Sequence, residues 1–166
     1  KQLAAIDKGN EYLIITTQKG EKVLNTDYKN FQVLFFKFPS ISPVFRLFWE
    51  QFYLWYVLKK NKMNVLYSPA NIGLIFFQFP TVVMIQTVAP FYPEMIRKQN
   101  IYYRLKFNIL RVLTTLSVRR AKKVIFISNK ARKEIGFYYN LKDESMSLIY
   151  HGRDLLFTPD LDRDRL

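Results

Sequence analysis

Gln86 and Thr87 are the polar pair whose position in the chain best suits ligand binding. They follow the apolar run Thr81–Ile85, which predicts a buried strand, and precede a loop with Pro90 and Pro93. A glutamine amide and a threonine hydroxyl both donate and accept hydrogen bonds, so the pair could hold a hydroxyl-rich ligand. Open α/β sheets bind ligands where their strands end. The alternative is that the pair only terminates a strand.

Ser128 has a comparable position after a second apolar strand. It follows "KVIFI" and precedes a run with a helical pattern, which predicts that Ser128 caps the helix N-terminus. The free N–H groups and the dipole at a helix N-terminus also favour anions, so the same position is a candidate anion site. The two roles are compatible.

The composition excludes several kinds of active site. The 166 residues contain no cysteine and a single histidine, His151, which excludes a thiolate site and disfavours zinc. Neither standard glycine-rich phosphate-binding motif is present. The remaining acidic clusters are typical of a solvated turn and tail: Asp143, Glu144, Asp160, Asp162 and Asp164. We therefore expect no metal site, and composition alone identifies no catalytic residue.

The chain is strongly basic, with a net charge of +13, and the charge is unevenly distributed. No aspartate or glutamate occurs from Met95 to Lys133, a stretch that holds twelve lysines and arginines. Such a surface attracts polyanions such as nucleic acid, an anionic membrane face or phosphorylated ligands. A solvated basic face without a dedicated partner is the alternative.

Apolar runs alternate with helical patterns along the chain, which predicts an α/β fold. The expected strands are Tyr12–Thr17, Phe31–Phe36, Asn64–Tyr67, Thr81–Ile85, Lys123–Ile127 and Met146–Tyr150. The expected helices are Lys1–Lys8, Pro43–Lys60 with Ser42 as its N-cap, Lys98–Arg120 and Ser128–Tyr139. Strands that are apolar on both faces indicate a mostly parallel sheet flanked by helices, so the predicted fold is Rossmann-like.

The expected helix Lys98–Arg120 is apolar around most of its circumference. We expect one stripe at helical spacing to face the core: Ile101, Leu105, Ile109, Val112 and Leu116. Arg97, Arg104 and Arg111 repeat on a flank, and the far side is again apolar, with Tyr103, Phe107 and Leu110. The second apolar side predicts burial under a loop or another domain, or contact with an anionic membrane surface.

We expect a single domain over residues 1–157, with residues 158–166 as the start of a linker or tail. The chain opens on an expected helix, whereas a Rossmann-like half begins with a strand, and it closes on the polar run "TPDLDRDRL". These features indicate a fragment of a longer protein that lacks its first strand. The most hydrophobic run, Val44–Leu58, contains charged residues and is shorter than the roughly 20 residues that span a bilayer.

Three motifs resemble the N-terminal domain of retaining GT-B glycosyltransferases of the large family 4. "NVLYSPANIG" is similar to a family strand that ends in a small-polar and proline turn. "VVMIQTVAPFYPE" resembles the strand whose end usually carries His-Asp or Gln-Asn, then Pro and Tyr-Pro-Glu. "AKKVIFISNKARKEI" with "SLIYHGRDLLFTP" resembles the segment that leads to the hinge between the two domains.

The resemblance implies that this domain binds the acceptor and that a C-terminal domain, absent here, binds the nucleotide-sugar donor. It places Gln86 where relatives often have a cleft histidine, Thr87 at the next position, and Tyr67 and Ser68 on the same acceptor wall. It assigns the hinge or donor side to Ser128, His151, Gly152, Arg153 and Asp154. No cofactor is implied beyond the donor itself.

The implied function is sugar transfer from a nucleotide-sugar to a glycan or lipid-linked acceptor, with this fragment alone inactive. Many relatives work at the cytoplasmic face of a membrane, so we expect a cytoplasmic protein, peripheral on the inner face, with Arg97, Arg104 and Arg111 toward anionic lipid. Two other classes stay open: a basic nucleic-acid-binding module and a non-catalytic Rossmann-like domain. The aromatic residues disfavour the former because most lie in apolar helices and strands.

Overall fold

The computed structural model describes residues 2–17, 28–36 and 43–152 of the chain. It divides the chain into two compact units, Lys1–Leu47 and Phe48–Leu166. The single domain expected over residues 1–157 stays a prediction.

The first unit contains helix α1 (Gln2–Ile6) and two parallel strands, β1 (Tyr12–Thr17) and β2 (Phe31–Phe36). Asp7 organises the turn between α1 and β1, because its carboxylate accepts hydrogen bonds from the amides of Gly9 and Asn10 and from the Tyr12 hydroxyl. These donors, the Tyr12 hydroxyl first, lower the pKa of Asp7 to about 2. The Tyr12 ring stacks on Phe31 with ring centroids 4.5 Å apart.

Helix α2 (Pro43–Lys60) runs across the boundary between the units and has the predicted bounds. Proline at its first position fits the preset backbone angle and missing N–H of that residue. Ser42, its predicted N-cap, lies outside the described residues.

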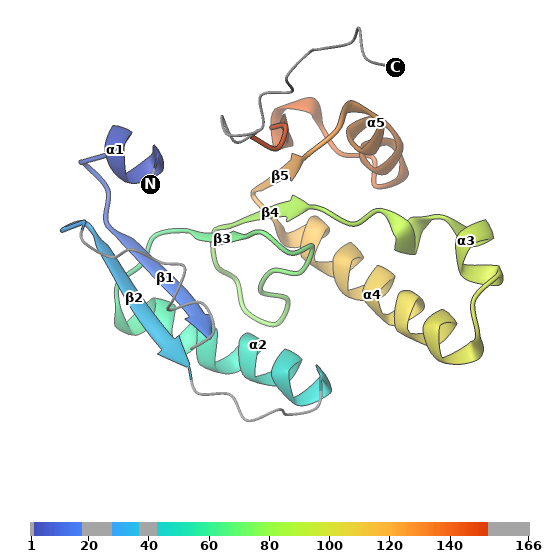
Figure 1. Cartoon of the computed structure of the whole chain (residues 1–166), viewed down its shortest axis with the longest axis horizontal. Helices are drawn as coiled ribbons and strands as arrows, with labels where there is room; N and C mark the ends of the chain where they lie inside the picture. Colours follow the sequence, from blue (N-terminus) through green and yellow to red (C-terminus); the bar gives the residue numbers. More distant parts are fainter. Residues whose placement is uncertain (1, 18–27, 37–42, 153–166) are drawn as a thin grey trace, which may run out of the picture. The chain divides into compact units, whose positions relative to one another are not determined.

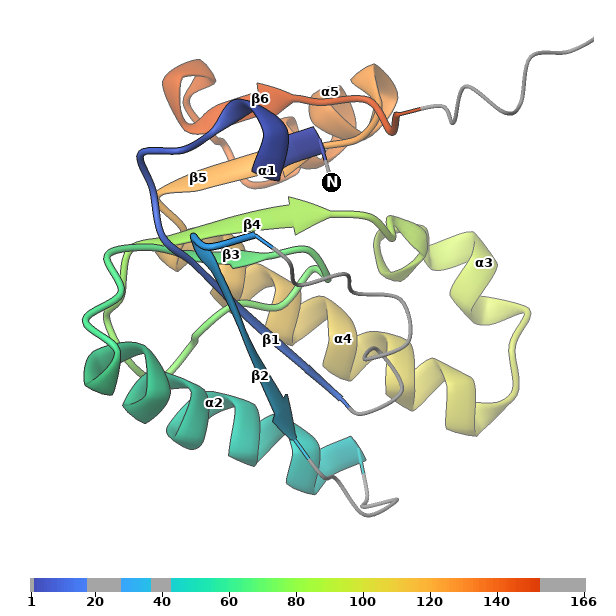
Figure 2. The same cartoon turned by 60° about the vertical axis from the view of Figure 1, so that its left-hand side comes forward.

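The second unit is built on a four-stranded parallel sheet in the order β3-β4-β5-β6 (Figure 1, Figure 2). The strands are β3 (Leu66–Ser68), β4 (Thr81–Ile85), β5 (Lys123–Phe126) and β6 (Met146–Leu148). Both described sheets are entirely parallel and are flanked by helices, so the α/β, Rossmann-like fold class predicted from the sequence is confirmed. The strands β3 and β6 are shorter than predicted.

Two helices cover one face of this sheet. Val83 and Ile85 of β4 and Val124 and Phe126 of β5 alternate onto that face and are almost completely buried. Against them pack Val118 from α4 (Ile101–Arg120) and Ala131 and Ile135 from α5 (Asn129–Tyr138). The apolar strand interiors thus form the core that positions both helices.

The predicted helix Lys98–Arg120 is confirmed as one helix that starts three residues later, and the proline-bearing loop before it contains a helix that was not predicted. A short helix α3 (Pro93–Arg97) follows a 3-10 turn, η2 (Ala89–Phe91), and α4 begins only at Ile101. The side chain of Asn100 caps α4 by accepting a hydrogen bond from the Tyr103 amide at 3.0 Å. The asparagine cap fixes the start of α4, and apolar periodicity alone does not indicate this boundary.

The prediction that one apolar stripe of α4 faces the core is wrong. Its five residues are between 38% and 77% exposed, and we call them the α4 stripe: Ile101, Leu105, Ile109, Val112 and Leu116. The opposite side is buried through Thr114, Ser117 and Val118. Small residues on that side let the helix backbone approach its neighbours, so packing space rather than side-chain hydrophobicity selected the inner face.

The connection between β3 and β4 has no regular structure over residues 69–80, yet Leu74 and Ile75 in it are buried. Its backbone is satisfied by side chains from two helices. Gln51 of α2 donates to the Gly73 carbonyl (3.0 Å) and accepts from the Ile75 amide, and Ser117 of α4 accepts from the Gly73 amide (3.1 Å). A Cβ at Gly73 would lie 2.9 Å from the Thr81 side chain, so only glycine fits without a shift.

We predict that Gln51→Leu lowers the free energy of unfolding by about 2–3 kcal/mol, because buried backbone groups of the connection lose their partners. Urea denaturation of the wild-type protein and the variant measures this. Gln78→Leu is the matched control, since Gln78 lies on the same connection but is exposed. An equal loss in both variants would contradict the assignment to Gln51.

Candidate functional site

The carboxyl ends of the four parallel strands bring most of the predicted site residues to one edge of the sheet. Ser68 ends β3 and pairs with Val83 of β4, while Ile85 pairs with Phe126 and Phe126 with Leu148. Residues that follow at this edge are Gln86 and Thr87 after β4, Ser128 after β5, and His151 and Gly152 after β6. The edge is therefore uneven, because β3 stops before its neighbours.

Asn71 holds the end of β4 in place. Its side-chain oxygen accepts hydrogen bonds from the amides of Gln86 (2.8 Å) and Thr87 (3.1 Å), and its side-chain nitrogen donates to the Thr87 carbonyl (2.7 Å). Asn71 is buried and has a left-handed backbone with φ 62°. This one side chain satisfies the backbone of both candidate residues, so their own side chains remain available for a ligand.

Gln86 and Tyr67 converge on the same sulfur atom. The Tyr67 hydroxyl donates to Met84 Sδ at 3.1 Å, and Gln86 Nε2 lies 3.8 Å from that sulfur. The register places Tyr67 beside Val82, so Tyr67, Met84 and Gln86 share the face of the sheet opposite the α4 and α5 core. Gln86 and Tyr67 are exposed beside Met84, and Thr87, next to Gln86 in the chain, is exposed as well; we call these three residues the polar border.

Ser68 has a structural contact of its own. Its hydroxyl donates to the Ile72 carbonyl and closes the turn that carries Asn71. The hydroxyl proton is thereby used, and the oxygen retains only acceptor capacity for a ligand. Ser68 could therefore only accept a hydrogen bond from a ligand, whereas the side chains of Gln86 and Thr87 could both donate and accept.

Ser128 caps α5, as predicted. Its Oγ accepts a hydrogen bond from the Ala131 amide at 3.1 Å, and its backbone is extended, with φ −147° and ψ 150°. The anion site at this helix end stays a prediction.

His151 and Gly152 are exposed at the end of the described chain. A Cβ added to Gly152 would meet nothing within 4 Å, so the surrounding space does not require glycine there. Arg153 and Asp154 lie outside the described residues. The hinge role of this segment stays a prediction.

The loop after Thr87 is anchored to α5. The Tyr92 hydroxyl donates to the Glu134 carboxylate, and this hydrogen bond is the main cause that raises the pKa of Tyr92 above its ordinary value. Phe91 makes an edge contact with Tyr139, with ring centroids 5.7 Å apart. The "APFYPE" segment therefore supports the end of β4 and offers no free acid or base at Tyr92.

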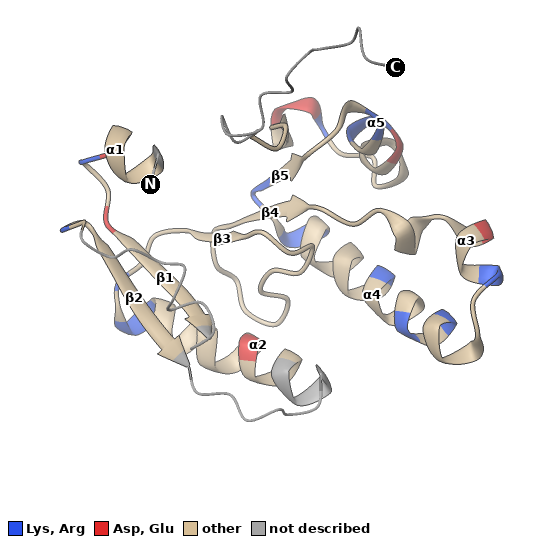
Figure 3. Cartoon of the chain, in the orientation of Figure 1, with Lys and Arg blue, Asp and Glu red and all other residues tan. Residues whose placement is uncertain are grey.

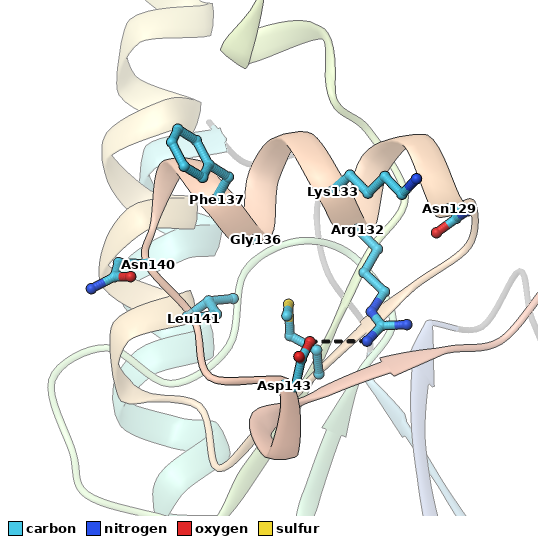
Figure 4. Close-up of a pocket in the computed structure, with 9 residues that line it drawn as sticks. Asn129, Arg132, Lys133, Gly136, Phe137, Asn140, Leu141 and Asp143 are labelled. Atoms are coloured by element: carbon cyan, nitrogen blue, oxygen red, sulfur yellow. Dashed lines mark hydrogen bonds and ion pairs between the residues drawn. The ribbon is translucent and has the colours of Figure 1, made fainter.

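A hollow of about 380 Å³ lies beside α5 and reaches Met146 of β6 (Figure 4). Arg132 and Asp143 form an ion pair across it at 3.0 Å, which neutralises both charges. Gly136 lines the hollow, and a Cβ there would lie 2.7 Å from Met146 Sδ. The ion pair and the contact at Gly136 indicate close packing between α5 and β6. The hollow is therefore a weaker candidate for a ligand site than the carboxyl edge of the sheet.

Two absences bear on the chemistry of the described residues. Within residues 2–17, 28–36 and 43–152, no three His, Asp or Glu side chains gather in a group that could hold a metal ion. No helix in this part of the chain is both long and apolar enough to cross a membrane.

No protein-family model and no curated protein matches this sequence. The class that the structure itself defines is an α/β protein with parallel sheets and a polar edge at the carboxyl ends of its strands. The resemblance to glycosyltransferases rests on the motifs quoted above.

Sequence reasoning overlooked two residues of this edge, Asn71 and Met84. A signal for Asn71 exists in "SPAN", because asparagine after a proline turn adopts the left-handed conformation more readily than most residues. Met84 gave no signal, since a methionine inside an apolar run is usually a core residue.

We predict that Asn71→Ala exposes the backbone at the end of β4 and lowers the free energy of unfolding by about 1–3 kcal/mol. Amide hydrogen exchange should accelerate at Gln86 and Thr87. Asn71→Gly is the matched control, because it removes the same side chain without the strain of a left-handed alanine. Both variants should accelerate exchange. Unchanged protection of the two amides would contradict the conclusion that the Asn71 side chain holds the end of β4.

Proposed function

We propose that this chain is the acceptor-binding domain of a retaining GT-B glycosyltransferase, which transfers a sugar from a nucleotide-sugar to a glycan or lipid-linked acceptor. The observation that carries the proposal is the border of Gln86, Thr87 and Tyr67 at the carboxyl edge of a parallel sheet. The backbone of Gln86 and Thr87 is held by Asn71, while their side chains are exposed.

The border suits a carbohydrate hydroxyl better than a charged ligand. Gln86 and Thr87 can each donate and accept a hydrogen bond, as an alcohol group does, and neither carries charge. The exposed Tyr67 ring supplies apolar surface of the kind that the C–H face of a sugar contacts. A glutamine cannot exchange protons at neutral pH, so Gln86 recognises and orients the acceptor instead of acting as a base.

The rate acceleration in this proposal comes from positioning and from stabilisation of the departing nucleotide diphosphate. The acceptor oxygen approaches the face of the anomeric carbon from which the diphosphate leaves. That leaving group binds to the donor domain, outside the residues described. The rigid end of β4 contributes by fixing the direction of the acceptor hydroxyl.

A nucleic-acid-binding module is supported less well by the aromatic side chains. The Trp55 ring stacks on Phe77 (4.6 Å between centroids), and Phe52 contacts both Phe76 and Phe77. Rings that pack on one another have less surface for base stacking.

We predict that Gln86→Ala in the full-length protein lowers kcat/KM for transfer about tenfold, the loss of one to two hydrogen bonds to the acceptor. Steady-state kinetics with a labelled nucleotide-sugar measures this. The thermal transition should stay unchanged, since the Gln86 side chain is exposed. Gln99→Ala, at another exposed glutamine, is the matched control. Unchanged turnover in Gln86→Ala would show that Gln86 only terminates the strand and does not bind the acceptor.

We also predict that residues 1–166 alone transfer no sugar, because the proposed donor site lies in another domain. The same assay, run on the fragment and on the full-length protein, tests this. Detectable transfer by the fragment would overturn the proposed division between acceptor and donor domains.

A further inference from the structure

The outer side of α4 combines features that an ordinary surface helix does not have. A helix on a soluble α/β domain normally presents polar residues to solvent. In α4 the exposed side is the α4 stripe, which extends from Ile101 to Leu116 over about 22 Å of helix axis. A shallow hollow of about 240 Å³, lined by Asn108, Ile109, Val112 and Leu113, lies on this helix.

Cations border the α4 stripe on both sides. At about 100° per residue, Arg104 and Arg111 fall on one flank and Lys106 and Arg120 on the other, with Arg119 at the end of the stripe. Arg111 is half-buried and the other four are exposed. None of the five forms a salt bridge with a described residue. Lys130, Arg132 and Lys142, on α5 and the loop after it, do form salt bridges with acidic neighbours.

The surroundings do not compensate this charge. The stretch from Met95 to Lys133 contains no acidic residue, and in Figure 3 α4 carries separate blue positions along its length and no red one. Tyr102 and Tyr103 stand at the start of the helix, both exposed, with the Lys106 ammonium 6.0 Å from the Tyr103 ring centroid. Tyrosine rings favour the boundary between hydrocarbon and water.

We propose that the α4 stripe docks on the surface of an anionic lipid bilayer, with α4 lying in the plane of the interface. The aliphatic side chains enter the boundary of the acyl chains, and the bordering cations contact lipid phosphates. This inference concerns the outer side of α4, which lies on the other face of the sheet from Gln86 and Tyr67, and it does not require the proposed transfer activity.

Charge and side-chain type select this occupant over two others. A second copy of the chain, related by a two-fold axis, would bring the same cations face to face, which opposes association. Nucleic acid would satisfy the cations, but aliphatic side chains give its bases and phosphates nothing to bind. An anionic bilayer is the partner that satisfies both the apolar stripe and the cations.

The test is co-sedimentation of the full-length protein with vesicles of phosphatidylglycerol and phosphatidylcholine, against vesicles of phosphatidylcholine alone. Binding should require the anionic lipid and weaken in high salt. Arg104→Gln with Arg119→Gln should reduce the affinity roughly 30-fold, the effect of two cations near an anionic surface. Lys130→Gln with Lys133→Gln removes the same charge from α5 and should have a smaller effect.

The apolar part of the proposal has its own variants. Leu105→Gln with Ile109→Gln leaves every charge in place and should weaken binding at least about tenfold, since two aliphatic side chains no longer enter the lipid. Phe137→Gln with Tyr138→Gln, at exposed positions on α5, is the matched control and should bind as the wild type does. All of these positions are exposed, and circular dichroism checks that each variant is folded.

Insertion can be observed directly, because the 166 residues contain no cysteine. A solvent-sensitive dye on Ile109→Cys, in a background without other cysteines, should shift to the blue with anionic vesicles, whereas the same dye on Phe137→Cys should not. Equal binding to neutral vesicles, or equal loss in the α5 controls, would overturn the proposal. So would vesicle-independent dimerisation that the stripe variants abolish, or salt-dependent binding of RNA or DNA without vesicle binding.

Discussion

The second unit depends on how it satisfies a buried segment of irregular backbone. The connection between β3 and β4 crosses the protein interior without helix or strand, so each of its buried N–H and C=O groups needs a partner. Gln51 and Ser117 supply partners from α2 and α4, and Asn71 turns back from the connection to the end of β4. Gly73 permits the close approach to β4 that places these side chains within reach. These hydrogen bonds hold α2, α4, the connection and the end of β4 together. Without them, the four segments would no longer be fixed relative to one another.

The same constraint explains the orientation of α4. Ser117 must face the connection to accept from Gly73, and Thr114 and Val118 lie on that side of the helix. A helix side made of small residues approaches the backbone more closely than one made of isoleucine and leucine could. The larger aliphatic residues are consequently left on the outside, and the exposed α4 stripe follows from the packing of the irregular connection.

Elements with one strong local signal could be predicted from the sequence. β1, β2, β4 and α2 have the predicted bounds, because continuous apolar runs, a Ser-Pro start and a lysine pair at the end are all local features. The inner face of α4 could not be predicted, since the helix is apolar on two sides and tertiary packing chooses between them. Asn71 was overlooked for a related reason: its partners, Gln86 and Thr87, are 15 and 16 residues away, and no periodicity connects them. The position of Gln86 and Thr87 at the carboxyl edge was predictable because it needs only the direction of one strand.

Helix α4 runs antiparallel to β4, and this direction relates the α4 stripe to the carboxyl edge of the sheet. β4 runs toward the carboxyl edge, the chain passes through η2 and α3, and α4 then returns along the sheet to the start of β5 (Figure 1). The N-terminal half of α4 therefore lies toward the edge that carries Gln86, and this half holds Ile101 and Leu105, the most exposed residues of the α4 stripe. Gln86 and Tyr67 lie on the opposite face of the sheet from α4, so a bilayer bound along the α4 stripe would leave their face uncovered. Because Ser117 joins α4 to the connection that also carries Asn71, hydrogen bonds to one segment link α4 to the end of β4. Binding of α4 to a bilayer would then fix the orientation of the carboxyl edge relative to the lipid surface.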